Sequence, residues 1–316
     1  MRVSIGDVRL YFDVEGAGLV PVGAAMAERP TLLLLHGGPG VDHTLFKPEF
    51  ATMADTAQVV YLDQRGSGRS DRGVPPQWTW EQWADDVAAF CAALDITRPV
   101  LVGASSGGMI ALVCAARHPG LVGALVLDSS FGGPMTLDES LAVFARRGGE
   151  AAREAARRHL TGDGSPEALA AWQEYCLPLY GGADEGGRND LADRLARVHV
   201  NDVVQAHFHA GGCGTDDVTP LGAAITCPTL VLAGADDPVT PVVSLERLAA
   251  SLVNAPVRLE VFGRVGHGVF RQAPGRAFAL LREFLAGKGV RSSPERVSSA
   301  QNAPRARSAG GRPSGS

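Results

Sequence analysis

The chain has 316 residues, of which 45% are hydrophobic and 20% are charged, as in ordinary soluble globular proteins. From residue 288 onward six basic residues stand against one acidic residue, a net +5, so residues 1–287 carry about −10 within the total of −5. An acidic body argues against nucleic-acid binding, and no apolar run reaches the roughly 18 residues of a membrane span.

Five cysteines are scattered along the chain without a Cys-x-x-Cys pair. An odd number of dispersed cysteines indicates reduced thiols, and neither a disulfide framework nor a zinc site. The N-terminus alternates apolar and polar residues, which predicts a strand and not a secretory signal. We therefore expect a cytoplasmic protein with no cofactor and no metal. The Ser-, Gly- and Pro-rich segment 287–316 is expected to be a disordered basic tail.

The first part of the chain alternates strand and helix patterns. Residues 3–14 predict a β-hairpin, and residues 17–29 predict a loop with room for one short strand. Four short apolar runs follow, each typical of a buried parallel strand. These strands are expected at 31–35, 58–62, 99–102 and 121–127, with helices at 79–94 and 109–117. The alternation predicts an α/β fold with a mostly parallel central sheet and helices on both faces.

The strand signal then disappears over residues 132–214. Amphipathic helices are predicted here at 137–147, 150–160, 166–180 and 188–209. The sheet pattern resumes with strands at 228–233 and 257–262 and helices at 241–252 and 274–285. We expect residues 1–131 and 215–286 to form the core, and residues 132–214 to form a helical cap inserted after the sixth strand.

A Gly-x-Ser-x-Gly sequence, Gly103 to Gly107, lies between a predicted strand and a predicted helix. This is the context of a nucleophile elbow, whose tight turn leaves no room for side chains at the two glycine positions. Ser105 and Ser106 are both present, but only Ser105 has glycine two residues before and two residues after it. The five residues alone are a weak signal, because Gly/Ser-rich loops produce them by chance.

A nucleophilic serine needs a base and a third group that orients the base. Asp236 and Asp237 follow the strand at 228–233, and His267 follows the next strand. The carboxyl ends of parallel strands meet at one edge of a sheet, so we predict a Ser105–Asp237–His267 triad. Asp236 and Asp128, which also follows a strand, remain alternative acids.

Two backbone donors are needed to stabilise the oxyanion. One is expected to be the N–H of Ser106, the residue after the nucleophile. The other is expected to be Gly38, in the loop His36–Gly40 (HGGPG) after an earlier strand. His36 is predicted to support this loop by hydrogen bonds.

The chain resembles the α/β-hydrolase superfamily over nearly all of residues 1–286. The HGGPG loop, together with Asp63–Ser70 (DQRGSGRS), is similar to the prolyl aminopeptidase (proline iminopeptidase) group of serine peptidases. The resemblance implies oxyanion donors at Gly38 and Ser106, and an acyl-enzyme that releases N-terminal proline from small peptides. It also implies that the Asp63–Ser70 stretch is structural, with Asp63 and Arg65 holding loops beside the site.

Members of this group bind the free amino terminus of the substrate with cap carboxylates. His207 stands where we would look for such a glutamate, and Glu174, Asp184 and Glu185 are further candidates. His207 and Glu174 are accordingly predicted to bind substrate. The alternatives are an esterase, lactonase or amidase with a non-peptide substrate, and a non-catalytic hydrolase-like binding protein. The expected partner is a small-molecule or short-peptide substrate, with no nucleic acid and no membrane; the oligomeric state is open.

Overall fold

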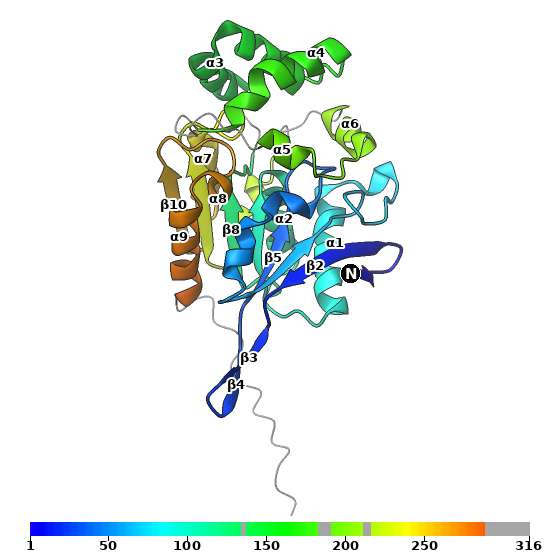
Figure 1. Cartoon of the computed structure of the whole chain (residues 1–316), viewed down its shortest axis with the longest axis vertical. Helices are drawn as coiled ribbons and strands as arrows, with labels where there is room; N and C mark the ends of the chain where they lie inside the picture. Colours follow the sequence, from blue (N-terminus) through cyan, green and yellow to red (C-terminus); the bar gives the residue numbers. More distant parts are fainter. Residues whose placement is uncertain (134–136, 183–190, 211–215, 288–316) are drawn as a thin grey trace, which may run out of the picture.

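The structure is a computed structural model of the whole chain, and it describes residues 1–133, 137–182, 191–210 and 216–287. In these residues eight strands form the central sheet, in the order β1-β2-β6-β5-β7-β8-β9-β10 (Figure 1). The strands are β1 (Arg2–Ser4), β2 (Arg9–Glu15), β5 (Thr31–Leu35), β6 (Gln58–Leu62), β7 (Val100–Ala104), β8 (Ala124–Asp128), β9 (Thr229–Gly234) and β10 (Val257–Phe262).

The sheet is parallel from β6 to β10, and β1 and β2 add two antiparallel connections at one edge. Its register aligns the carboxyl ends of neighbouring strands: Leu35 pairs with both Leu62 and Gly103. The loops that follow β5, β6 and β7 therefore begin side by side. This alignment brings segments that are far apart in the sequence to one edge of the sheet.

Helices cover both faces because alternate residues of each buried strand point to opposite sides. Leu33 and Leu35 of β5 pack with α1 (Trp80–Ala93), α2 (Ser106–Arg117) and α7 (Val242–Ser251). Leu32 and Leu34 pack on the other face with the 3₁₀ turns η1 (His43–Phe46) and η2 (Glu49–Met53), and with α8 (Val269–Gln272) and α9 (Pro274–Ala286). The all-apolar strands predicted from the sequence are thus buried on both sides.

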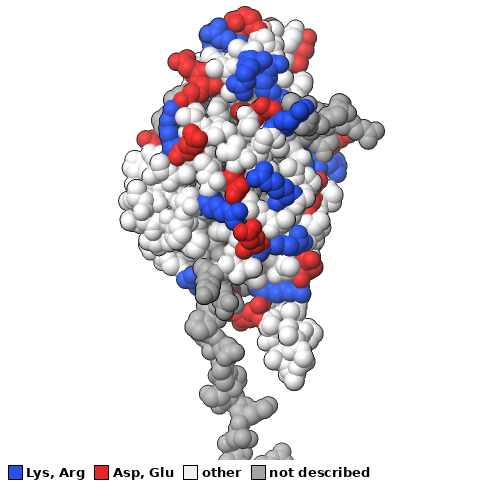
Figure 2. Space-filling view, turned by 90° about the vertical axis from the view of Figure 1, so that its left-hand side faces the viewer, with Lys and Arg blue, Asp and Glu red and all other residues white. Residues whose placement is uncertain are grey.

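A separate hairpin projects from the end of the molecule that lies opposite α3 and α4 (Figure 1). It pairs β3 (Leu19–Val22) with β4 (Ala25–Glu28) and turns through Gly23, whose φ is +60°. The prediction of a loop with one short strand at 17–29 was incomplete, because a positive-φ glycine in a two-residue turn allows both arms to pair. Residues 19–27 of this hairpin carry no charge and form the white lobe at the lower end of Figure 2, while charges of both signs intermingle over the face above it.

Between β8 and β9 the described residues 137–182 and 191–210, called the insertion below, lie over the carboxyl edge of the sheet (Figure 1). Their elements are α3 (Leu137–Leu160), α4 (Pro166–Ala171), the short π-helix η4 (Trp172–Cys176), the 3₁₀ turn η5 (Leu177–Tyr180), α5 (Leu191–Leu195) and α6 (Asp202–Ala210). The helix α3 is interrupted at Gly149, where φ is 74°, as the two predicted helices require.

The single helix predicted at 188–209 was wrong, because residues 196–201 separate α5 from α6. Asn201 accepts a hydrogen bond from the Val203 N–H and thereby begins α6 as a new helix. The core and cap boundaries stay predictions, since residues 134–136 and 211–215 lie outside the described part. The tail from residue 288 onward lies outside it as well. In the described part of the chain no helix is long and apolar enough to cross a membrane.

Candidate active site

Ser105 occupies the turn between β7 and α2 in a strained conformation, with φ 51° and ψ −122°. The glycines on either side are required by close backbone packing. A Cβ on Gly107 would lie 2.0 Å from the Leu35 carbonyl oxygen, and a Cβ on Gly103 would lie 2.5 Å from the Gly107 carbonyl oxygen. The Ser105 N–H donates to the Asp128 carbonyl at 2.9 Å, which fixes the turn against β8.

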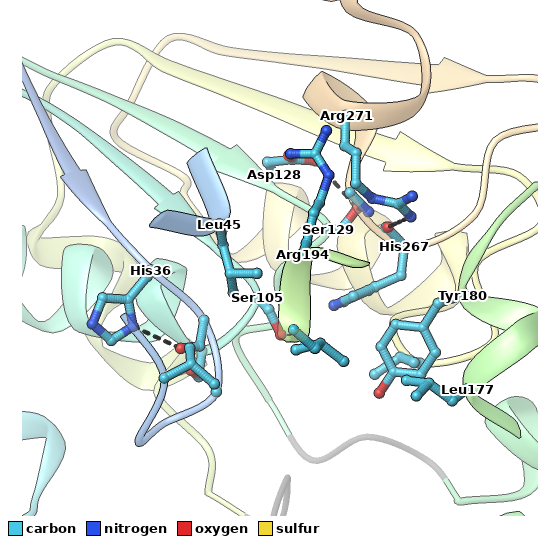
Figure 3. Close-up of a pocket in the computed structure, with 18 of the residues that line it drawn as sticks. His36, Leu45, Ser105, Asp128, Ser129, Leu177, Tyr180, Arg194, His267 and Arg271 are labelled. Carbon is cyan, nitrogen blue, oxygen red and sulfur yellow. Dashed lines mark hydrogen bonds between the residues drawn. The ribbon is translucent and has the colours of Figure 1, made fainter. Parts of the chain in front are cut away.

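His267 Nδ1 donates to Oδ2 of Asp237 over 2.9 Å. Asp237 is buried and accepts three further hydrogen bonds, from the Val239 N–H at 2.8 Å, the Thr240 N–H at 2.9 Å and the Thr240 hydroxyl at 2.6 Å. A carboxylate held by this many donors can orient an imidazole. With its proton on Nδ1, the ring presents Nε2 as an acceptor, and Figure 3 shows the ring directed toward Ser105.

Asp237, and not either alternative acid, makes the hydrogen bond with the imidazole Nδ1. The Asp236 carbonyl oxygen accepts from Arg147 at 2.6 Å, while the neighbouring Asp237 takes the position beside the imidazole. Asp128 is buried and accepts from the backbone N–H groups of Val269, at 2.8 Å, and Phe270. Burial raises the pKa of Asp128, while these two hydrogen bonds act in the opposite direction. Asp128 therefore anchors the start of α8, directly after His267.

Of the proposed oxyanion donors, Ser106 follows Ser105 directly and Gly38 lies in the glycine loop that packs on Ser105. Ser106 is the first residue of α2, so its N–H has no carbonyl one turn earlier within the helix. The glycine loop runs directly over the elbow: a Cβ on Gly37 would lie 3.0 Å from the Ser105 Cβ. Gly38 adopts a φ of +115° in this loop, a conformation that favours glycine.

His36 supports the glycine loop from below. Its Nδ1 pairs with the Gly37 carbonyl at 2.8 Å, and its Nε2 accepts from the Gln64 N–H at 3.4 Å. The Gln64 side chain returns a hydrogen bond to the His36 carbonyl at 3.0 Å. Burial lowers the pKa of His36, which keeps the ring neutral and suits one donating and one accepting nitrogen. These contacts correspond to the supporting role predicted for His36.

The stretch Asp63–Ser70 connects neighbouring loops near the site by hydrogen bonds and ion pairs. Asp63 is fully buried and accepts from both the N–H and the Nδ1 of His43, at 2.9 and 2.7 Å. Burial alone would raise the pKa of Asp63, but the hydrogen bond from His43 helps to lower it. Arg65 makes two-pronged ion pairs with Asp86 and with Asp7, at 2.7–2.9 Å. This stretch connects the sheet edge to α1 and to the β1–β2 turn.

A cavity of about 600 Å³ opens over Ser105 between the core and the insertion. Its wall includes Ser105, Ser106, Gly38 and His267. Most of the remaining wall is apolar and comprises Val41, Leu45, Phe46, Phe50, Phe131, Leu160, Leu169, Trp172, Leu177, Leu195, Val200, Val239 and Phe270. A cavity of this size and lining accommodates a small, largely apolar molecule.

Charged residues that carry no signal in the sequence also line the cavity. Arg194 of α5 pairs with both carboxylate oxygens of Glu49 in η2, and the Arg194 side chain is only 6% exposed. Arg271 of α8 lines the same cavity and donates to the His267 carbonyl at 3.1 Å. The sequence carries no motif for Glu49 or Arg194, since the pair joins segments 145 residues apart.

The two residues predicted to bind substrate do not line this cavity. His207 is exposed and packs edge-to-face on Trp78, with 5.4 Å between ring centroids. Glu174 is exposed on η4, where its neighbour Gln173 lines the wall instead. The sequence does not reveal which face of each insertion helix turns toward the cavity. Asp184 and Glu185 lie outside the described residues. Among those described, no cluster of three His, Cys, Asp or Glu could hold a metal.

Comparisons with known proteins identify the family and the fold. A family model described as "alpha/beta hydrolase fold" matches residues 30–274. The chain is 29% identical over 293 residues to a putative carbamate hydrolase RutD of Caulobacter vibrioides, covering 90% of this chain and 99% of the relative.

Two solved structures give the same fold. The proline iminopeptidase of Mycobacterium smegmatis has a TM-score of 0.72 and 25% identity, covering 90% of this chain and 97% of that one. A thermophilic esterase from Thermogutta terrifontis has a TM-score of 0.66 and 25% identity, covering 90% of this chain and 98% of the esterase chain. The predicted fold and the resemblance to the proline iminopeptidases are confirmed, while the similar proteins differ in the bond they cleave.

Proposed function

The chain belongs to the α/β-hydrolase family, and on that premise we propose that it is a serine hydrolase working through an acyl-enzyme on Ser105. The observation that carries the proposal is the 2.9 Å hydrogen bond from His267 to Asp237, beside a cavity that Ser105 also lines. A base with a fixed tautomer, facing a strained serine, is the arrangement that nucleophilic catalysis requires.

In this mechanism Ser105 attacks a carbonyl carbon while Nε2 of His267 takes its proton. Asp237 stabilises the imidazolium that forms. The N–H groups of Ser106 and Gly38 donate to the oxyanion, and His267 then protonates the leaving group. Water, activated by the same histidine, hydrolyses the acyl-enzyme. The insertion covers the cavity and limits access of bulk water.

For the substrate, we propose an ester, lactone or neutral amide with a small apolar acyl group. The apolar wall supports this choice, because it favours a substrate without charge next to the reacting carbonyl. The Glu49–Arg194 pair offsets its own charges, so it adds polarity to one side of the cavity and little net charge.

Release of N-terminal proline is the second candidate, supported by the HGGPG and DQRG motifs and by the similarity to a proline iminopeptidase. A prolyl substrate carries an ammonium group that needs an anion. Of the described carboxylates lining the cavity, Glu49 pairs with Arg194, Asp128 accepts backbone N–H groups, and Asp202 is exposed. Glu49 and Asp128 are thus already engaged, which supports ranking the peptidase second.

The test has two parts. A fluorophosphonate probe should label the wild type at one site and leave Ser105→Ala unlabelled. Hydrolysis of p-nitrophenyl butyrate should fall about 10,000-fold or more in Ser105→Ala, as in other serine hydrolases that lose their nucleophile. A folded wild type that is not labelled would contradict the proposal and favour a non-catalytic binding protein.

A substrate comparison then separates the two candidates. The wild type should hydrolyse p-nitrophenyl butyrate with a kcat/KM well above that for proline p-nitroanilide. Alanine p-nitroanilide serves as the control for the anilide leaving group. A proline anilide that outperforms both other substrates would reverse the order of the candidates.

A further inference from the structure

The C-terminal end of η5 runs as a short segment, Leu179–Gly182, against the loop that carries His267. The His267 N–H donates to the Tyr180 carbonyl at 2.8 Å, and the Tyr180 ring packs edge-to-face on the imidazole at 5.1 Å. The two backbones are in direct contact, since a Cβ on Gly266 would lie 2.4 Å from the Tyr180 carbonyl oxygen. The insertion therefore touches the proposed catalytic base through its main chain.

Gln272, the last residue of α8, joins the two segments through its side-chain amide. Its Oε1 accepts from the N–H groups of Gly182 and Gly266, both at 2.7 Å. Its Nε2 donates to the carbonyls of Tyr180, at 2.9 Å, and His267, at 2.8 Å. One amide thus satisfies two donors and two acceptors, one of each from either segment. Only one orientation of the amide fits this pattern.

Arg147 of α3 also binds the segment Leu179–Gly182 through hydrogen bonds. Its guanidinium donates to the carbonyls of Leu179 and Gly181, and to the carbonyl of Asp236 at 2.6 Å. Asp236 directly precedes the proposed catalytic acid. The segment therefore lies between the loop of the acid, reached through Arg147, and the loop of the base, reached through Gln272.

We propose that Gln272 is a positioning residue, which sets the place of His267 relative to Ser105 by locking its loop to the insertion segment Leu179–Gly182. The inference rests on the proposed function, because it concerns the base of that reaction. Gln272 is absent from the cavity wall and binds only backbone groups, so it acts through His267 and not on substrate.

The test compares Gln272→Met, which removes all four hydrogen bonds at similar volume, with Gln77→Met. Gln77 is the matched control, because it is also partly buried, accepts from the Val74 N–H at 3.1 Å and donates to Asp7 at 2.7 Å, away from the cavity. Active sites are titrated with the fluorophosphonate probe, so that kcat refers to folded and competent enzyme. Gln272→Glu retains the accepting oxygen but replaces the donating amide nitrogen, so it tests the donating half of the amide.

We expect kcat on p-nitrophenyl butyrate to fall about 100-fold in Gln272→Met with KM within about threefold of wild type, the effect of a misplaced reacting group. The rate constant for phosphonylation of Ser105 should fall in parallel. Gln272→Glu should also lower both, because its second oxygen would face the Tyr180 and His267 carbonyl oxygens. Gln77→Met should keep the wild-type kcat.

Other outcomes separate the two proposals. A wild type that the probe labels, combined with a Gln272→Met variant that keeps the kcat of Gln77→Met, would overturn the positioning role and leave the serine hydrolase intact. If Gln272→Met does not fold, the same comparison is made with Gln272→Glu, whose wild-type kcat and labelling rate would equally overturn it. A wild type that is not labelled contradicts the serine hydrolase itself.

Discussion

The insertion meets the core on two sides of Ser105, and the two contacts differ in chemistry. On the base side, Arg147 and Gln272 bond to backbone groups of the segment Leu179–Gly182 and of the loops around Asp236 and His267. On the oxyanion side, carboxylates take part. Asp42 accepts from the His199 N–H at 3.1 Å, and Glu49 pairs with Arg194. Asn201 completes this side by donating to the Gly40 and Gly66 carbonyls.

The insertion is therefore attached to the core in two ways, by bonds to backbone groups on the base side and by bonds that involve carboxylates on the oxyanion side. Backbone partners on the base side do not change charge in the neutral range, and close main-chain packing fixes their geometry. The oxyanion side depends on side chains whose charge and reach can change. We therefore expect the base side to be intolerant of added volume, and the oxyanion side to respond to charge and to acid.

The largest effect is expected from Gly266→Ala. The new Cβ would meet the Tyr180 carbonyl oxygen at 2.4 Å, so the two backbones must separate and the unfolding free energy should fall by about 3 kcal/mol. Urea unfolding and ester hydrolysis measure the two consequences. Gly263→Ala is the control, because a Cβ there has no heavy atom within 4 Å. Equal stability of the two variants would show that the segments are not in rigid contact.

Arg147→Met should have the next largest effect. It leaves the Leu179, Gly181 and Asp236 carbonyls without their charged donor, at a cost of about 2 kcal/mol. Thermal and urea unfolding report the loss, and kcat should fall as well because the loop of the acid moves. Arg146→Met, at the exposed neighbouring position, should behave as wild type. A larger loss at Arg146 would contradict the assignment.

The Glu49–Arg194 pair should contribute less. A double-mutant cycle with Glu49→Gln and Arg194→Met is expected to give a coupling free energy of about 1 kcal/mol, because both side chains are largely shielded from water. The exposed pair Arg258–Glu283, 2.8 Å apart, provides the reference cycle, and its coupling should be below about 0.5 kcal/mol. Equal couplings would remove the distinction between a cavity pair and a surface pair.

The smallest effect is expected on the pH dependence of folding stability. Burial by itself would raise the pKa of Asp42, but hydrogen bonds from Thr44 and His199 lower it below its ordinary value. A carboxylate with a lowered folded-state pKa stabilises the protein above its unfolded-state pKa, near 3.9 for aspartate, and loses that contribution as the pH falls through the folded-state pKa.

Urea midpoints between pH 6 and pH 2 measure this dependence, since the loss begins near the unfolded-state pKa and continues below it. As the pH falls, the urea midpoint should decrease less in Asp42→Asn than in wild type. In Arg147→Met it should decrease as much as in wild type. An unchanged slope in Asp42→Asn would mean that Asp42 is not part of the acid response.

The position of the proposed catalytic residues was predictable because they follow strands. Ser105, Asp237 and His267 each follow a short apolar run, and parallel strands end at a common edge whatever lies between them in sequence. Asp237 was preferred over Asp236 from the sequence, and the hydrogen bond between His267 Nδ1 and Asp237 Oδ2 supports that choice.

The insertion was less predictable for a physical reason. Helical periodicity gives the faces of a helix but not the partner of each face, so His207 and Glu174 were assigned to a cavity that Gln205 and Gln173 line. The break before α6 arises from the cap at Asn201, which the pattern of apolar residues did not distinguish from a helix interior. The role proposed for Gln272 depends on four backbone groups from two segments. No sequence motif predicts these contacts, because backbone groups are the same in every residue.

The β3–β4 hairpin has a practical consequence. It turns at Gly23, where a Cβ would have no heavy atom within 4 Å, at the end of the molecule that lies opposite the insertion (Figure 1). A peptide tag or a fused domain placed in this turn would leave the sheet and the insertion untouched. Protein immobilised on a bead through that tag would hold its reactive end toward the solution, in one orientation.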